Sequence, residues 1–118
     1  MKYAILFYET PAKLAERDDP KKAQNYWGAW GAYVKALEES GLVTAGAGLQ
    51  PPATATSVRL RDGKRQVQDG PLIDAKEQFG GFFVIDAPDL DTALAWAARS
   101  PAAADAGVEV RPLLPPMP

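Results

Sequence analysis

Apolar and polar positions along the chain predict six strands and two helices. The run from Lys2 to Tyr8 is almost wholly apolar, which is typical of a strand covered on both faces. From Pro20 to Gly41 apolar residues recur at every third or fourth position, so we expect a helix there. Gly28 and Gly31 lie inside it, and we expect a close backbone or ligand contact to offset their low helix propensity. The apolar stripe consists of Tyr26, Trp27, Trp30, Tyr33, Val34 and Leu37.

A β-hairpin is predicted around Asp62-Gly63, because this dipeptide favours a two-residue turn between strands. The predicted strands are residues 57–61 and 64–68, with Val58 opposite Val67 and Leu60 opposite Arg65. Four cations gather here, either as a solvated edge that resists aggregation or as an anion or nucleic-acid contact. No aromatic residues are interleaved with them, which argues against single-stranded nucleic acid. The cations are Arg59, Arg61, Lys64 and Arg65.

The remaining pattern completes two β-α-β halves. Strands are predicted at residues 42–47, 79–86 and 108–113, and a helix follows the capping residue Asp89 and stops at Ser100-Pro101. Its apolar side consists of Leu90, Ala93, Leu94 and Ala97. This order predicts one α+β domain over residues 1–118, a ferredoxin-like sandwich whose antiparallel sheet carries two helices on one face.

The opposite face of that sheet is left without cover. Both the first strand and the strand at 79–86 carry apolar residues on both sides, and a large exposed apolar face usually marks an interface. We therefore expect a homodimer with its sheets packed face to face, an arrangement of the dimeric α/β-barrel type. Trp96 falls outside the apolar side of its helix, so it serves either this interface or a neighbouring loop of its own chain.

Composition narrows the chemistry further. The formal charge is −2, which gives no global attraction for nucleic acid, and the chain has no Cys and no His. Disulfides, thiolate nucleophiles and zinc-thiolate sites are thereby excluded. No apolar run approaches a membrane span, and the short N-terminal run does not fit a signal peptide. We expect a soluble cytoplasmic protein with no cofactor, no metal, no nucleic acid and no membrane partner.

The tripeptide Asp69-Gly70-Pro71 is the main candidate for chemistry. In one interpretation the Asp69 carboxylate accepts backbone N–H groups in an Asx-turn, Gly70 allows an unusual dihedral angle and Pro71 fixes the exit. In the other, Asp69 lies at the mouth of a pocket as a general base or ligand contact, which requires partial burial to raise its pKa. The two interpretations are compatible.

Other candidate ligand contacts surround this tripeptide in the sequence pattern. Lys76 lies in a short charged run that is either a solvated connection or a lid neutralising a substrate carboxylate. The pair Gly80-Gly81 favours a bulge or close strand packing over a phosphate cradle, since no phosphate-loop motif is present. Aromatic residues of the first helix belong to the core or line a pocket. The candidate ligand-binding residues are Tyr8, Tyr26, Trp30, Gly70, Pro71 and Lys76.

The segment DGPLIDAKEQFGGFFVID resembles the signature of the YciI-like (YCII-related, or DGPF) domain family, with Leu72 where Phe is usual. The flanking stretches GAGLQPPATATSVRLRDGKRQVQDGP and DAPDLDTALAWAARSP resemble the family too, so the likeness covers nearly the whole chain. The resemblance implies a ferredoxin-like fold, dimerisation and an acidic active-site residue at Asp69. It also implies that some relatives are enzymes, including a dehydrochlorinase of a chlorinated hydroxymuconate, and that some accompany sigma-factor-type regulators.

One departure from the family pattern decides between mechanisms. In some relatives the acidic residue pairs with a His, and this chain has none, so an Asp–His dyad is excluded. We expect a pocket near Asp69 for a small anionic or aromatic-derived molecule, such as an organic acid, with cofactor-free lyase or isomerase chemistry. The alternative is a non-catalytic ligand-binding or regulatory module.

Overall fold

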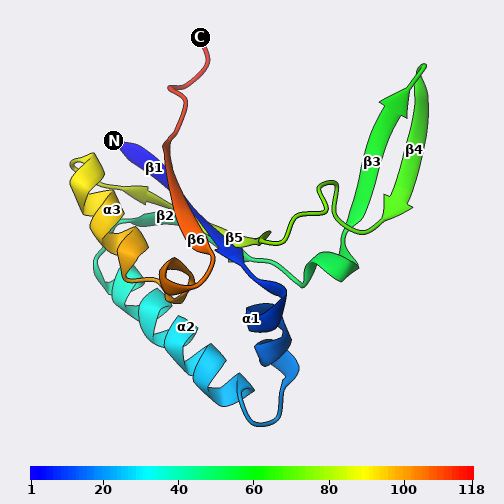
Figure 1. The fold of residues 1–118 in the computed structure, drawn as a ribbon. Coiled ribbons are helices and arrows are strands. Elements are labelled where there is room, and N and C mark those ends of the chain that lie inside the picture. The colour runs from blue at the N-terminus through cyan, green and yellow to red at the C-terminus, as the bar shows by residue number, and fades with distance from the viewer.

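The computed structural model describes residues 1–118, and its centre is a four-stranded antiparallel sheet (Figure 1). Its strands are β1 (Lys2–Glu9), β2 (Val43–Gly48), β5 (Gln78–Asp86) and β6 (Gly107–Pro112), in the order β2-β5-β1-β6. All four begin and end within one residue of the predicted positions. The predicted α+β class is therefore confirmed, with an antiparallel sheet and two main helices.

Helices α2 (Ala23–Glu39) and α3 (Leu90–Ala98) follow β1 and β5, as the pattern predicts, and Gly41, with φ 76°, comes just after α2. The predicted start of α2 at Pro20 is wrong. The Asp19 carboxylate accepts the Lys21 backbone N–H at 2.8 Å, so a separate turn precedes the helix. Before it lie two elements that the pattern did not reveal, the short helix α1 (Pro11–Ala15) and the 3₁₀ turn η1 (Glu16–Asp18).

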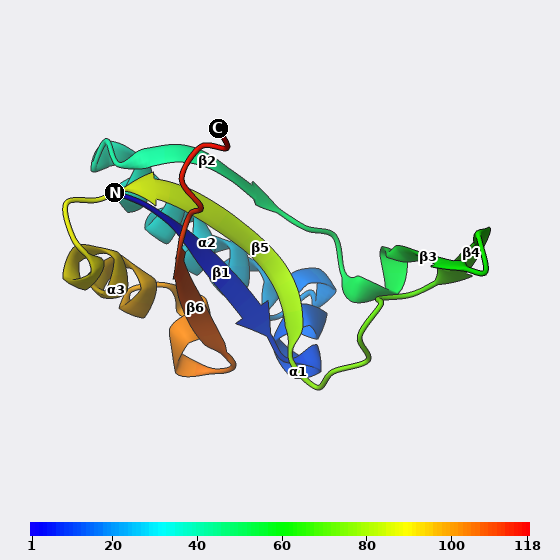
Figure 2. The ribbon, with the colours of Figure 1, turned by 90° about the horizontal axis from the view of Figure 1, so that it is seen from above.

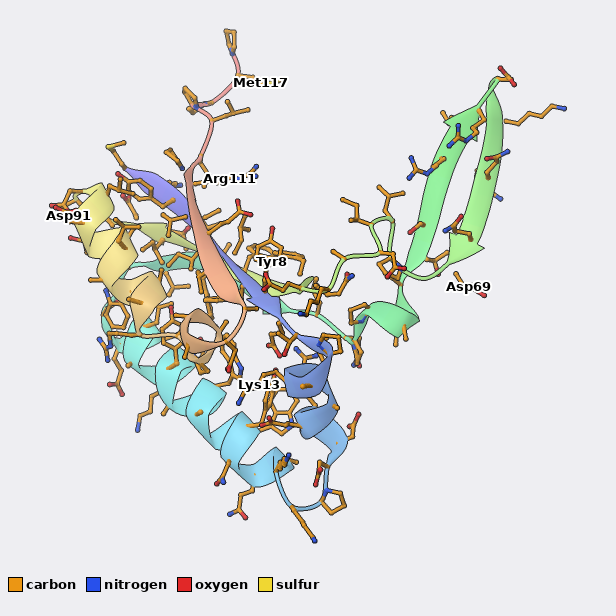
Figure 3. The ribbon with its side chains drawn as sticks, in the orientation of Figure 1. Tyr8, Lys13, Asp69, Asp91, Arg111 and Met117 are labelled. Carbon is orange, nitrogen blue, oxygen red and sulfur yellow. The ribbon has the colours of Figure 1, made fainter.

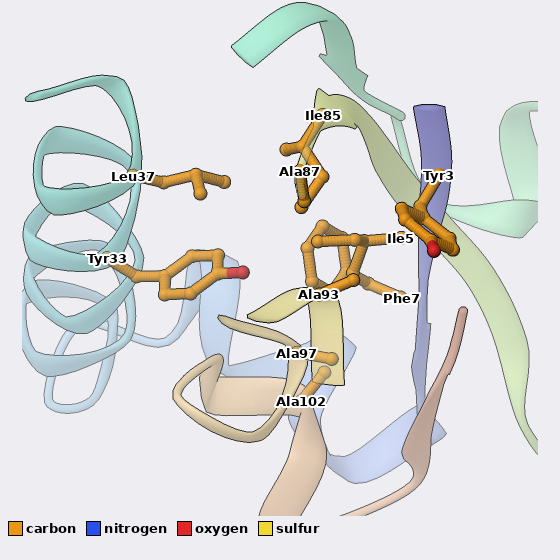
Figure 4. Packing of buried hydrophobic residues seen from close by; sticks show 10 residues of the cluster. All are labelled: Tyr3, Ile5, Phe7, Tyr33, Leu37, Ile85, Ala87, Ala93, Ala97 and Ala102. Atoms are coloured by element: carbon orange, nitrogen blue, oxygen red, sulfur yellow. The ribbon is translucent and has the colours of Figure 1, made fainter. Parts of the chain in front are cut away.

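The hydrophobic core lies between the sheet and these two helices (Figure 4). Ile5, Leu37 and Ile85 are its largest fully buried side chains. Helix α3 approaches through small residues, Ala93 and Ala97, which are buried. Its Leu90 and Leu94 are each 46% exposed, so the predicted apolar side of this helix is wrong for both leucines. Trp96 is partly buried against this core, with the Arg99 guanidinium 4.2 Å from its ring centre.

The two glycines inside α2 have no close neighbour. A Cβ atom built at Gly28 or Gly31 would meet nothing within 4 Å, and both residues are exposed. The expected close backbone contact at these positions is therefore wrong.

The predicted hairpin forms a second, separate sheet of two strands, β3 (Thr56–Arg61) and β4 (Lys64–Asp69). Its register is the predicted one, with Val58 opposite Val67 and Leu60 opposite Arg65. Asp62 and Gly63 both have positive φ, 53° and 74°, as a two-residue hairpin turn requires. The hairpin projects away from the body of the molecule in both ribbon views (Figures 1 and 2). It joins the body through η2 (Pro52–Thr54) on one side and residues 70–77 on the other.

One face of the main sheet faces the helices and the other faces outward. Tyr3, Ile5, Phe7 and Glu9 are buried on the helix side of β1, so the residues between them lie on the outer face. Figure 2 shows α2 passing behind β5 and β1 on one side only. Outer-face residues, defined by this alternation and by strand register, include Ala4, Leu6, Tyr8, Phe82 and Val84. The 3₁₀ turn η3 (Pro101–Ala104) links α3 to β6.

None of the helices has both the length and the apolar character needed to cross a membrane.

Candidate functional site

The main cavity lies between the sheet and α2, with a volume of about 590 Å³. Its walls come from five elements, β1, η1, α2, β2 and β5, together with the residues that follow β2. Four glycines of β2 and β5 line its sheet side, Gly46, Gly48, Gly80 and Gly81. Its volume falls in the range that holds a small organic molecule.

A cluster of three polar side chains forms one end of this cavity. The Tyr26 hydroxyl lies 2.7 Å from both carboxylate oxygens of Glu9 and donates its hydrogen to that carboxylate. The Arg17 guanidinium donates through Nε to the Tyr26 hydroxyl at 2.9 Å. It also lies 3.5 Å from Glu9 Oε1 through Nη2 and donates through Nη1 to the Leu49 carbonyl at 2.8 Å. Arg17 therefore ties β1, α2 and the chain after β2 together.

Burial makes this cluster unusual among the charged groups of the chain. Glu9 is only 4% exposed, and it is the one buried carboxylate. A buried carboxylate is costly unless it is paired and hydrogen-bonded, and here Arg17 and Tyr26 meet that need. Burial raises the pKa of Tyr26 to about 12, and the hydrogen bond to Glu9 adds to the rise. Tyr26 is therefore a protonated hydrogen-bond donor throughout the physiological pH range.

Aromatic rings form the wall beside this polar end. Phe7 meets Trp30 edge to face with ring centres 5.1 Å apart, and it meets Phe83 at 6.1 Å. Trp27 is exposed at the rim, where its indole N–H donates to the Arg17 carbonyl at 3.2 Å. The cavity thus combines flat apolar walls with one compact polar end, the arrangement expected of a site for a ring-shaped ligand.

The Gly80-Gly81 pair positions β5 under this site. Phe7 pairs with Gly81 and Tyr8 pairs with Phe79, so Gly80 is the extra residue of a β-bulge, as predicted. A Cβ atom at Gly81 would lie 2.9 Å from the Ala47 carbonyl oxygen, so this glycine permits close packing against β2. A Cβ atom at Gly80 would contact Glu9 Oε1 at 3.5 Å. The bulge therefore lies directly beneath the polar cluster.

The residues predicted from the sequence fall into three separate places. Tyr26 and Trp30 line the main cavity. Tyr8 and Lys76 line a second, more open hollow of about 560 Å³ together with Glu109. There, burial raises the pKa of Tyr8, and the Glu109 carboxylate adds to the rise.

The tripeptide at residues 69–71 lines neither hollow. Figure 3 shows Asp69 at the foot of the hairpin, away from α1, α2 and α3. Gly70 has φ 97°, as the turn interpretation predicts, and its N–H donates to the Ala55 carbonyl at 2.7 Å. Its carbonyl accepts the Ser57 hydroxyl at 2.7 Å. The backbone of Gly70, and not the Asp69 carboxylate, makes the hydrogen bonds of this turn, and the catalytic role of Asp69 stays a prediction.

Two members of the polar cluster, Glu9 and Arg17, were not predicted from the sequence. Glu9 had a signal, because it continues the alternation of Tyr3, Ile5 and Phe7 and so places a carboxylate on the buried side of β1. Arg17 had none, since it lies in a polar segment without periodicity. No group of three or more acidic side chains lies close enough together to hold a metal ion.

Comparison of the sequence with known proteins identifies its relatives. The family model for the YCII-related domain matches residues 1–116. An uncharacterised protein of Rhizobium meliloti (strain 1021) is 32% identical over 118 residues, which cover 96% of this chain and 92% of that protein.

A solved structure shares the fold at lower identity. It is the 5-chloro-2-hydroxyhydroquinone dehydrochlorinase of Burkholderia phenoliruptrix AC1100, in complex with 2,5-dihydroxybenzoquinone. The likeness has a TM-score of 0.56 at 17% identity and covers 97% of this chain and 94% of that one. The name of that enzyme gives a hydroxyhydroquinone as substrate, not the hydroxymuconate that the family resemblance implied.

Proposed function

Because the chain belongs to the YCII-related domain family and holds a buried carboxylate at the end of an aromatic cavity, we propose that this cavity binds a hydroxylated aromatic-derived molecule. The Glu9–Tyr26–Arg17 cluster is the observation that carries the proposal. Ring faces of Phe7 and Trp30 supply the apolar contact, and Glu9 accepts a ligand hydroxyl.

Charge favours this ligand class over an organic acid, the other class expected from the sequence. The cavity lining contains Glu9, Asp18 and Glu38 but only one cation, Arg17, which is already engaged by the cluster. An anionic ligand would meet an excess of negative charge there. A phenolic hydroxyl instead offers the hydrogen-bond donor that a carboxylate accepts best.

The same cluster supports cofactor-free proton transfer of the lyase or isomerase type. Glu9 accepts a proton from a ligand hydroxyl or carbon, and the freed electron pair forms a new double bond. In the lyase case the ligand is in its diketo tautomer, and Glu9 takes the proton from the ring carbon next to the one that bears chlorine. The C–H electron pair becomes a ring C=C bond and the C–Cl bond breaks with its electrons on chloride, so one proton and one chloride leave together. Tyr26 and Arg17 orient the Glu9 carboxylate for this step.

A substrate known from the structural relative tests the proposal. Binding of 5-chloro-2-hydroxyhydroquinone is measured by calorimetry under argon, and chloride release is followed with an ion electrode. Glu9→Gln removes the charge while keeping the shape, so we expect binding to weaken roughly 10- to 100-fold and chloride release to stop. The matched control Glu39→Gln changes an exposed carboxylate at the end of α2, outside the cavity, and should change neither.

Three outcomes separate the alternatives. Binding without chloride release, lost in Glu9→Gln, supports the second candidate, a ligand-binding or regulatory module, which the absence of any His favours. Binding that is unchanged in Glu9→Gln contradicts the assignment of this cluster. No binding of the hydroxyhydroquinone, with binding of benzoate in its place, contradicts the argument from charge.

We also propose that the fold is a ferredoxin-like sandwich that pairs as a dimeric α/β barrel. Support comes from the strand order β2-β5-β1-β6 and from the apolar outer face formed by Ala4, Leu6, Phe82 and Val84. Two copies packed through this face would remove it from water. Light scattering should give the mass of a dimer, and Leu6→Glu should give a monomer.

A further inference from the structure

The β3–β4 hairpin has no packing partner within its own chain. It is a sheet of two strands paired only with each other, and such a hairpin is marginally stable by itself in water. The radius of gyration is 16.1 Å, whereas a compact domain of this length has about 13.5 Å. The molecule extends 51 × 46 × 19 Å, so the hairpin widens it greatly.

The two faces of this hairpin differ sharply. By strand register, Val58, Leu60 and Val67 share one face, and they are 55%, 73% and 54% exposed. Arg65, opposite Leu60, lies on this face too, with Thr56 and Asp69 at its base, whereas Arg59, Arg61 and Lys64 lie on the other face. An amphipathic two-stranded sheet with its apolar face uncovered has the pattern of a surface that packs against something. Leu72 and Ile73, which follow the hairpin, are also exposed.

A second copy of this chain is the occupant that the observations favour. The outer face of the main sheet is a further uncovered apolar surface of the same chain, and a two-fold dimer covers such surfaces reciprocally in both copies. Charge agrees. The hairpin, residues 56–69, holds four cations and two carboxylates, whereas the rest of the chain holds nine cations and thirteen carboxylates. The arm and the body therefore carry opposite net charge, which favours their encounter at long range, although most of these cations lie on the face that stays outside the contact.

We propose that the hairpin is a dimer clasp, whose apolar face packs on the body of the second copy. Asp69 shares that face, because it pairs with Thr56 and lies two residues from Val67. The clasp thus turns Asp69 from an exposed residue of one subunit into a residue of the subunit interface. This inference rests on the proposed dimer, and it gives a role in that dimer to the hairpin, which the sheet-to-sheet contact does not use.

The first test compares substitutions on the two faces by analytical ultracentrifugation. Leu60→Ser removes an apolar side chain, and Arg59→Ser, its neighbour on the polar face, is the matched control. We expect Leu60→Ser to raise the dimer dissociation constant roughly 100-fold, since a symmetric dimer loses the contact twice and each lost contact accounts for about a factor of ten. Arg59→Ser should change it much less. At protein concentrations too low for dimerisation, both variants should keep the unfolding midpoint of the wild-type monomer, because the hairpin lies outside the core.

The second test uses the absence of cysteine in the chain. A benzophenone attached to Leu60→Cys should yield, after illumination, an adduct of dimer mass on a denaturing gel. Mass spectrometry should place the other end of the cross-link in the sheet or helices of the second copy. The same label on Arg59→Cys should remain uncoupled.

The outcomes distinguish this inference from the proposed dimer. A wild-type dimer whose dissociation constant is unchanged in Leu60→Ser, with cross-links only inside one chain, overturns the clasp and leaves the sheet dimer standing. A wild-type monomer overturns both. Dimer-mass adducts from Leu60→Cys together with loss of dimer in Leu60→Ser support both.

Discussion

Removal of the Tyr26 hydroxyl gives the sharpest test of the polar cluster. Tyr26→Phe keeps the ring, which meets Trp27 edge to face at 4.8 Å, and deletes the group that donates to Glu9. Glu9 would then retain only Arg17, whose Nη2 lies 3.5 Å away, at the limit of a hydrogen bond. A buried carboxylate would have lost its best partner.

The expected cost follows from the burial of Glu9. A hydrogen bond to a charged group contributes about 1.5–3 kcal/mol, and an unsatisfied buried group costs a similar amount. We therefore expect Tyr26→Phe to lower the free energy of unfolding by about 1.5–3 kcal/mol. With an unfolding entropy of about 2.1 cal/mol/K per residue, this corresponds to a fall in Tm of roughly 6–12 °C for a chain of 118 residues.

Urea unfolding followed by tryptophan fluorescence measures this change at one fixed protein concentration. Two other buried tyrosines supply a graded control series. Tyr33 donates to the Trp96 carbonyl at 3.0 Å, so Tyr33→Phe should cost about 1 kcal/mol. The Tyr3 hydroxyl hydrogen-bonds only to the Met1 sulfur, at 3.6 Å, and Tyr3→Phe should cost less.

The test is the order of the three losses in unfolding free energy. If Tyr26→Phe costs no more than Tyr3→Phe, the Glu9 carboxylate is satisfied without this hydroxyl, and the argument that Tyr26 pairs with and orients Glu9 fails. If Glu9→Gln, Tyr26→Phe and the double variant give additive losses, the two groups are not coupled and the cluster does not act as a unit.

The other predictions concern pH and backbone space. Burial raises the pKa of both Tyr26 and Tyr33 to about 12, so the folded state holds these protons more tightly than the unfolded chain. Their contribution to stability is complete below pH 10 and is lost as the pH rises toward 12; urea midpoints across this range should fall less in Tyr26→Phe than in wild type. At Gly81 an added Cβ would lie 2.9 Å from the Ala47 carbonyl, so Gly81→Ala should destabilise by more than about 1 kcal/mol. An added Cβ at Gly31 would meet nothing within 4 Å, so Gly31→Ala should stabilise α2 by about 0.5–1 kcal/mol. Calorimetry should therefore show a lower Tm for Gly81→Ala and a higher Tm for Gly31→Ala.

Local pattern was enough to predict the strands, because strand identity depends on alternation and on turn residues. The register of the hairpin followed from Asp62-Gly63 alone, since a two-residue turn fixes which residues lie opposite. The side of α3 that packs was predicted wrongly, because a helical wheel ranks Leu above Ala, whereas close approach to the sheet selected Ala93 and Ala97.

The site was harder to predict because it depends on tertiary placement. Tyr26 and Trp30 were identified from their position on an aromatic helix, and both line the cavity. Asp69 belongs to the strongest motif, yet the residues of a hairpin do not determine the direction in which the hairpin projects from the sheet. The motif therefore could not show that Asp69 lies outside the cavity. Arg17 reaches the cluster from a segment without periodicity, so only the folded chain brings it to Glu9.

The bulge at Gly80 is a position where a side chain can change the size of the cavity without moving the strands around it. A methyl group added there meets Glu9 at an ordinary contact distance of 3.5 Å and collides with no backbone atom. The size of the side chain at this position would therefore determine how large a substituent on a bound ring the cavity can accept. Gly80→Ala would narrow the cavity by one methyl group while the strands that carry the polar cluster stay in place.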